Sequence, residues 1–150
     1  MRIMKIFDNP DAMLKSKFGQ YQIAVLGNIV AVSAEGTASK SAIARYSQDM
    51  IDVITSFNGE RWAFLGLLHG SALLTNDAEV ELQKSIEWRA KHGMAMGALV
   101  TGETTVESMV KMQFERIYKN AEVQLGIFGC EESALSWLSE KGFSPTVNSD

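Results

Sequence analysis

Two glycines with the spacing of a phosphate-binding loop lie between a predicted strand and a predicted helix. Gly97 and Gly102 fit that spacing, but Glu103 stands where the loop needs a lysine. The lysine balances the phosphate charge while backbone amides cradle the oxygens, so a carboxylate there repels the anion. The segment therefore favours a structural turn from strand to helix. No G-x-G-x-x-G pattern follows any predicted strand, so dinucleotide binding has no local support.

Cys130 and His69 are the candidates for nucleophilic catalysis. Cys130 opens a predicted helix, where the helix dipole can lower a thiol pKa, but Glu131 and Glu132 oppose that effect. His69 ends a strand at the edge where α/β sheets bind ligands, although a polar strand end is the simpler interpretation. A nucleophile also needs an oriented base, and no His or Lys lies beside Cys130 in the sequence. A small hydrolase or transferase therefore ranks last, and we expect no catalytic residue and no enzyme.

The acidic residues and the few cysteines and histidines predict no metal site. Asp77, Glu79 and Glu81 are close in sequence, but their spacing on a helix does not pair carboxylates at short range, so they indicate a solvated face. One cysteine and two histidines form neither an intramolecular disulfide nor a closed zinc set. We expect no metal, no cofactor and a reducing, cytoplasmic location.

Composition predicts one ordinary soluble domain. The chain has 150 residues, of which 46% are hydrophobic and 21% charged. Its net charge of −4 argues against nucleic-acid binding, which needs a basic face. The longest apolar runs are four residues, far below the ~20 that span a bilayer, and no signal-peptide stretch follows Arg2 and Lys5.

Short apolar runs alternate with amphipathic segments, which is typical of an α/β domain. Residues 21–26 and 29–35 predict a hairpin about Gly27-Asn28, and the run at 62–68, which is apolar apart from Gly66, predicts a central strand. Residues 104–107 fit a capping box for a helix that ends near residue 120. The other expected helices are 40–57, 77–91 and 131–141, and the other strands are 94–100 and 123–128.

The expected order is β-β-α-β-α-β-α-β-α, a mostly parallel sheet with an antiparallel N-terminal hairpin and right-handed crossovers. In the second helix a strict i+4 stripe is expected to face the core; its members are Ala78, Leu82, Ile86 and Ala90. We divide the chain into a leader at 1–20, the domain at 21–141 and a polar tail at 142–150.

Three stretches resemble the STAS superfamily, and within it the SpoIIAA-like branch. Residues 29–37 form a strand that runs through Glu35-Gly36 into a helix, and Lys91-His92-Gly93 ends a helix before the strand at 94–100. Residues 127–138 are similar to the family's closing pattern of a Phe followed by E-x-A-x-x-W-L. The resemblance covers about residues 20–141 and implies the STAS fold.

The SpoIIAA-like branch is similar to the lipid-binding CRAL-TRIO domains. The resemblance therefore implies a non-catalytic domain that binds a nonpolar small molecule or lipid, or rests on a membrane. The alternative is a STAS-type regulatory module, like an anti-sigma-factor antagonist, that docks on a protein partner. Its D-S-S-G phosphoserine loop would fall near residues 74–77, where the sequence has no such motif and Thr75 fits a helix cap.

A ligand cleft is expected where the parallel strands end, because side chains from neighbouring strand ends converge at that edge. Its predicted walls are His69, Ser71, Leu73, Leu74, Thr101 and Phe128. The 8 methionines, with Met109 and Met112 on one helix, fit an adaptable apolar surface, although core filling is the usual reason for methionine.

The leader carries a net charge of +2, against −6 for the rest of the chain. It has apolar residues that can meet acyl chains while its cations meet anionic headgroups at the inner face of a membrane. The predicted membrane contacts are Ile3, Met4, Ile6 and Phe7. Asn9 and Pro10 break any long amphipathic helix, so packing on the domain or across a homodimer interface is the alternative.

Overall fold

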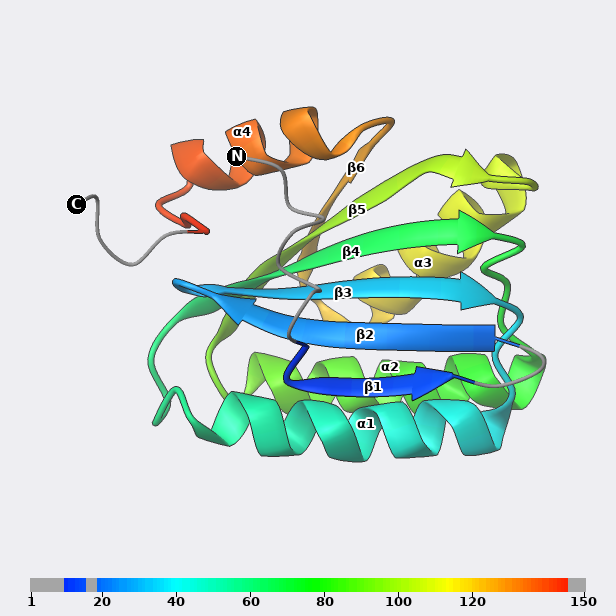
Figure 1. Cartoon of the computed structure of the whole chain (residues 1–150), viewed down its shortest axis with the longest axis horizontal. Helices are drawn as coiled ribbons and strands as arrows, with labels where there is room; N and C mark the ends of the chain where they lie inside the picture. Colours follow the sequence, from blue (N-terminus) through cyan, green and yellow to red (C-terminus); the bar gives the residue numbers. More distant parts are fainter. Residues whose placement is uncertain (1–9, 16–18, 146–150) are drawn as a thin grey trace.

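The computed structural model describes residues 10–15 and 19–145, which form a six-stranded sheet flanked by helices (Figure 1). Neighbouring strands in the sheet are consecutive in the chain. The strands are β1 (Ala12–Lys15), β2 (Gly19–Leu26), β3 (Ile29–Gly36), β4 (Trp62–Gly70), β5 (Met94–Thr104) and β6 (Gln124–Phe128). The helices are α1 (Lys40–Thr55), α2 (Asn76–Ala90), α3 (Glu107–Ala121) and α4 (Glu131–Glu140).

The sheet is mixed, as the sequence predicts. Strands β1, β2 and β3 pair antiparallel, and β3 to β6 pair parallel. The β2–β3 hairpin turns at Gly27, whose φ of 56° favours glycine. The α/β class, with a mostly parallel sheet and an antiparallel N-terminal hairpin, is therefore confirmed.

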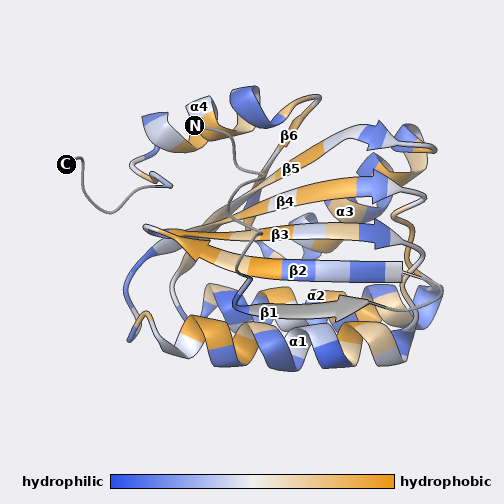
Figure 2. Ribbon diagram, in the orientation of Figure 1, coloured by the Kyte–Doolittle hydropathy of each residue, from blue (hydrophilic) through white to orange (hydrophobic). Residues whose placement is uncertain are grey.

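The sheet buries both of its faces. Helices α1, α2 and α3 pack on one face and α4 packs on the other (Figure 1). Strand β4 is buried from Trp62 to Leu68, with Phe64 facing α1–α3 and Leu65 facing the α4 side. In Figure 2 the middle strands are mostly hydrophobic along their length and turn hydrophilic at their carboxyl ends.

Strand β1 lies inside the segment that the sequence analysis assigns to a leader. Ala12 pairs with Ile23 and Lys15 with Gln20, so β1 extends the sheet at its edge. Four residues are too short to show an alternating pattern, which is why the sequence does not reveal this strand.

The predicted tail also begins too early. Phe143 is only 1% exposed and belongs to the core on the α4 side. The side chain of Asn28 donates to the Gly142 carbonyl and accepts from the Ser144 amide, at 3.2 and 2.9 Å. Residues 142–144 are thus packed against the β2–β3 turn.

The predicted capping box at 104–107 is wrong. Helix α3 begins at Glu107, its N-cap is Val106, and no side chain of the described residues caps it. Strand β5 continues to Thr104, whose hydroxyl donates to the Thr101 carbonyl at 2.6 Å. Glu107 accepts from the Thr101 hydroxyl at 2.7 Å instead of reaching back to a cap amide. A capping box needs the threonine at the N-cap, three residues before the glutamate, and here the strand occupies that place.

Candidate ligand-binding cavity

A cavity of about 480 Å³ lies between the sheet and the layer formed by α1, α2 and α3. This volume is within the range of small-molecule sites, roughly 300–1,000 Å³. Most of the side chains that line it are apolar or aromatic. From the sheet these are Tyr21, Val32, Ala34, Phe64, Leu68 and Leu99, and from the helices Ile43, Tyr46, Leu82, Ile86, Phe114 and Tyr118.

Small residues on facing elements leave this space open. Ala34 on β3 and Ala42 on α1 both line the cavity, and so does Gly66 on β4. A Cβ added to Gly66 would lie 2.7 Å from the Leu99 side chain and 2.8 Å from the Phe64 ring, so a larger residue here would push these side chains aside. Interiors normally fill such gaps with larger side chains, because unfilled space forfeits packing contacts.

The mouth of the cavity lies where β3 and β4 end. The lining residues there are exposed and mostly polar: Gln20, Glu35, Thr37, Ser39, Ser41 and Arg45. The β3–α1 loop and the β4–α2 loop lie at the mouth. Two backbone hydrogen bonds join these loops: the Ala38 amide donates to the Leu73 carbonyl at 2.9 Å, and the Thr75 amide donates to the Ala38 carbonyl at 3.2 Å. This is the edge of the sheet where the sequence places a ligand cleft.

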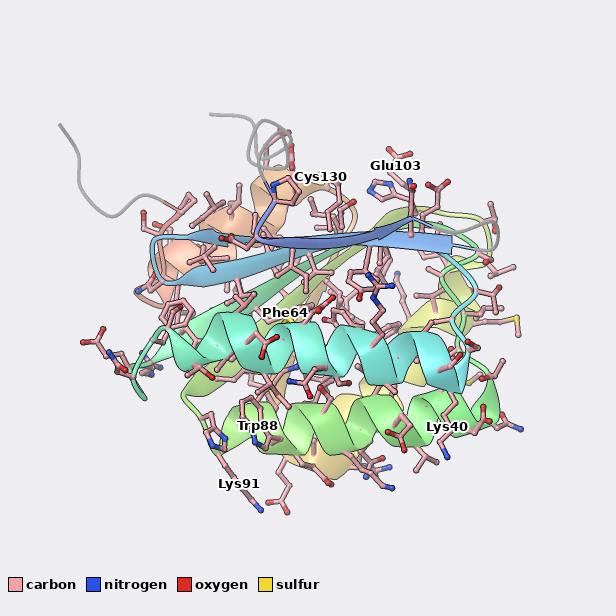
Figure 3. All side chains as sticks on the ribbon, turned by 60° about the horizontal axis from the view of Figure 1, so that its bottom comes forward. Lys40, Phe64, Trp88, Lys91, Glu103 and Cys130 are labelled. Carbon is pink, nitrogen blue, oxygen red and sulfur yellow. The ribbon has the colours of Figure 1, made fainter. Side chains whose placement is uncertain are left out.

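Arg89 lies in the buried part of the cavity. It is only 1% exposed, and its Nε and Nη2 atoms make no hydrogen bond within the described part of the chain. Its Cζ atom lies 5.1 Å from the centroid of the Tyr46 ring and 5.3 Å from that of Phe64. Figure 3 shows Phe64 between α1 and the sheet. A charged group is thus held among aromatic rings, where cation–π attraction offsets part of its desolvation.

The tyrosines beside Arg89 do not supply a counter-charge. Burial raises the pKa of Tyr46 and of Tyr118, and this exceeds the opposing effect of Arg89, which acts through its charge on both and also through a hydrogen bond on Tyr46. Both phenols therefore stay neutral at physiological pH. Among the cavity-lining residues that the structure describes, Glu35 is the one acidic side chain, and it is exposed at the mouth, where it accepts from Gln20 at 3.0 Å.

Of the six predicted cleft residues, the structure places Leu73 and Leu74 in the cavity lining. Ser71 is beside the mouth, with its hydroxyl 2.9 Å from that of Thr37. His69, Thr101 and Phe128 do not line the cavity.

The other three predicted residues have different surroundings. The buried Thr101 hydroxyl donates to Glu107, and Phe128 packs against Trp137 on the α4 side. His69 pairs in register with Glu35 of β3 and Glu103 of β5. Successive strand residues point to opposite faces, so a position at a strand end does not by itself tell which face a side chain joins.

Sequence reasoning missed Arg89, the most unusual residue of the cavity. The predicted stripe of α2 ends at Ala90, but Ala90 is exposed and Arg89 takes the buried position after Ile86. A helical stripe allows steps of three as well as four residues. The position of Arg89, three residues after Ile86, is therefore the feature of the sequence that could have shown that Arg89 is buried.

The glycines of the phosphate-loop pattern serve packing instead. Both lie within β5, and Gly97 lies under the Tyr118 ring, 2.8 Å from where a Cβ would be. A Cβ on Gly102 would collide with the carbonyl oxygen of Gly129. The backbone is an extended strand here, so no anion-binding loop forms.

Cys130 and Thr75 both stand at helix N-termini. A hydrogen bond with the Ser133 hydroxyl lowers the pKa of the exposed Cys130 thiol. Figure 3 shows Cys130 and Glu103 on the opposite side of the sheet from Phe64. The Thr75 hydroxyl accepts from the Ala78 amide and donates to Asp77, at 3.4 and 2.7 Å, as a helix cap does.

Two further features concern metals and membranes. In the described residues, no group of three or more His, Cys, Asp or Glu side chains could hold a metal ion. No helix formed by residues 10–15 or 19–145 has the length and apolarity to cross a bilayer. The predicted membrane contacts Ile3, Met4, Ile6 and Phe7 lie outside the described residues.

Comparison with known proteins finds no protein-family model, no curated protein and no solved structure that matches this chain. The resemblance to the STAS superfamily stays a prediction.

Proposed function

We propose that this domain is a non-catalytic module that binds a nonpolar small molecule or lipid in the cavity between the sheet and α1–α3. The observation that carries the proposal is the cavity itself, with a volume of about 480 Å³ and mostly apolar walls. Apolar cavities of this size with a few polar groups are the usual form of small-molecule sites.

The arrangement of the chemically reactive residues supports a binding role over catalysis. Cys130 and His69 do not line the cavity, and Cys130 is on the α4 side of the sheet. The polar groups that do line it are mainly at the mouth, where they can meet solvent or a polar part of the ligand. A cytoplasmic protein that exchanges its ligand at a membrane surface fits both this cavity and the cationic, apolar leader.

The test is organic-solvent extraction of the purified protein followed by mass spectrometry, with binding of the neutral apolar dye Nile red as a second measurement. We expect a nonpolar compound to co-purify and the dye to bind. Ala42→Leu, which fills the cavity from α1, is expected to weaken dye binding at least about tenfold.

Ala44→Leu is the matched control, because Ala44 is exposed on the same helix and does not line the cavity. Binding by this variant should equal that of the unmodified protein. Equal binding by both variants would place the dye elsewhere, and a protein that neither carries a ligand nor binds the dye would contradict the proposal.

A further inference from the structure

We propose that the ligand is an amphiphile with an anionic carboxylate headgroup, which binds head-inward with the carboxylate on Arg89 and the apolar tail along the cavity. This inference rests on the proposed function and adds the chemical class and the orientation of the ligand. Three observations carry it: the buried guanidinium, whose Nε and Nη2 have no hydrogen-bond partner among the described residues; the presence of only one acid, the exposed Glu35, in the described lining; and the apolar walls of the cavity.

The buried charge of Arg89 favours an anionic ligand. Guanidinium groups stay protonated in proteins and do not escape burial by becoming neutral, as a lysine or carboxyl group can. Buried ions are normally paired, because desolvation costs more than aromatic contacts return. Glu35, the one acidic residue in the described lining, is exposed at the mouth and already accepts from Gln20. An anion supplied by a ligand would complete the pairing.

The geometry of the Arg89 guanidinium favours a carboxylate, as a comparison with Arg116 shows. Arg116 binds Glu79 side-on, with Nε donating to one carboxylate oxygen at 2.7 Å and Nη2 to the other at 2.6 Å. In Arg89 the same two atoms, Nε and Nη2, have no hydrogen-bond partner in residues 10–15 and 19–145. Their fixed fork matches a planar carboxylate through two parallel hydrogen bonds.

The burial of Arg89 favours a ligand that binds with its head inward. Arg45 also lines the cavity, but it is exposed at the mouth, where water screens its charge. Coulombic attraction is stronger in the low-dielectric interior, so an anionic head gains more at Arg89. The tail then lies against side chains that are themselves apolar, such as Leu82, Ile86 and Phe114.

Isothermal titration calorimetry with three probes that share one tail tests the proposal: decanoate, decan-1-ol and decyltrimethylammonium. We expect the unmodified protein to bind decanoate at least about tenfold more tightly than the alcohol and to bind the cation most weakly. Arg89→Met should abolish the preference for the acid and still bind the alcohol. Arg45→Met, the matched control at the mouth, should keep the preference.

Thermal unfolding of the ligand-free variants separates binding from folding. Replacing a buried unpaired charge with an apolar side chain of similar size is expected to leave the Tm of Arg89→Met unchanged or raised. If this variant does not fold, Arg89→Lys, which keeps the charge but loses the fork, should bind decanoate more weakly and still prefer it to the alcohol.

Each contrary outcome has a distinct meaning. Equal affinity of the unmodified protein for decanoate and decan-1-ol would overturn the headgroup assignment and leave the proposed function intact. Loss of the preference in Arg45→Met but not in Arg89→Met would place the head at the mouth and overturn the orientation. Failure to bind any of the three probes would count against both the inference and the proposed function.

Discussion

The guanidinium of Arg89, in the last turn of α2, lies against the ring of Tyr46 in the middle of α1, with 5.1 Å between Cζ and the ring centroid. The two helices thus share a buried cation–phenol contact at the wall of the cavity. Both side chains are desolvated. Burial raises the pKa of Tyr46, so the phenol stays neutral and does not balance the arginine charge.

The fold raises the pKa of all three tyrosines of the chain above the ordinary value of 10.0. Burial is the main cause for each, and the Asp49 carboxylate, 2.6 Å from the Tyr21 hydroxyl, adds to it for Tyr21. The folded state keeps protons that the unfolded chain releases, so the tyrosines' contribution to stability is fully present below about pH 10 and is lost as the pH rises further.

Tyrosinate absorbance measured together with circular dichroism checks this expectation. The absorbance should rise only as the helical signal is lost. Tyr46→Phe keeps the ring and removes one titrating group, so its unfolding should depend less steeply on pH above 10. Tyrosinate that forms near pH 10 while the protein stays folded would contradict the prediction.

Gly102→Ala should destabilise the protein by about 1–3 kcal/mol, the usual cost of overpacking. The added methyl group would collide with the Gly129 carbonyl oxygen, which is part of the backbone and cannot move aside as a flexible side chain can. Gly129→Ala is the matched control, because a Cβ there meets no atom within 4 Å and the change should stay within about 0.5 kcal/mol. Urea unfolding measures both, and equal free energies of unfolding for the two variants would disprove the packing role of Gly102.

Glu79→Gln should lower the urea midpoint at neutral pH and have little effect below about pH 3. Hydrogen bonds from Arg116 lower the pKa of Glu79 below its ordinary 4.5, so the pair stabilises the fold above that pH and is lost as the pH falls. Glu81→Gln removes a looser contact, 3.7 Å from Lys84, and should change the midpoint less. A larger effect at Glu81, or an effect at Glu79 that persists in acid, would be inconsistent with this linkage.

The sequence predicts those parts of the fold whose information is local. The turn at Gly27, the apolar run of β4 and the 3-and-4 spacing of α1 each specify their structure within a short window. The cavity is different, because β2, β3, β4 and three helices contribute to its walls from distant parts of the chain. Whether Arg89 or Ala90 faces inward depends on the rotation of α2 against its neighbours, which tertiary packing decides.

The last prediction concerns the apolar residues of the leader, whose role the sequence alone suggests. Deleting residues 1–20 would also remove β1 and expose the edge of β2, so substitutions are the cleaner change. Replacing Ile3, Met4, Ile6 and Phe7 with serine should reduce co-sedimentation with anionic liposomes, because fewer apolar groups reach the acyl chains. A net charge of +2 adds about 1 kcal/mol for each charge near an anionic surface, so binding by the unmodified protein should weaken with salt.

The control variant replaces exposed apolar residues elsewhere on the molecule. Met109 and Met112 on α3 are 52% and 57% exposed, and changing them to serine removes apolar surface without touching the leader. If the leader is the membrane element, the methionine variant co-sediments with liposomes like the unmodified protein. The four leader substitutions then abolish the salt-sensitive part of the liposome binding. Equal sedimentation of the leader variant and the unmodified protein would leave packing on the domain or in a homodimer as the role of these residues. The oligomeric state of the leader variant, measured by analytical ultracentrifugation, then separates these two cases, because loss of a homodimer contact lowers the mass and loss of a packing contact lowers only the Tm.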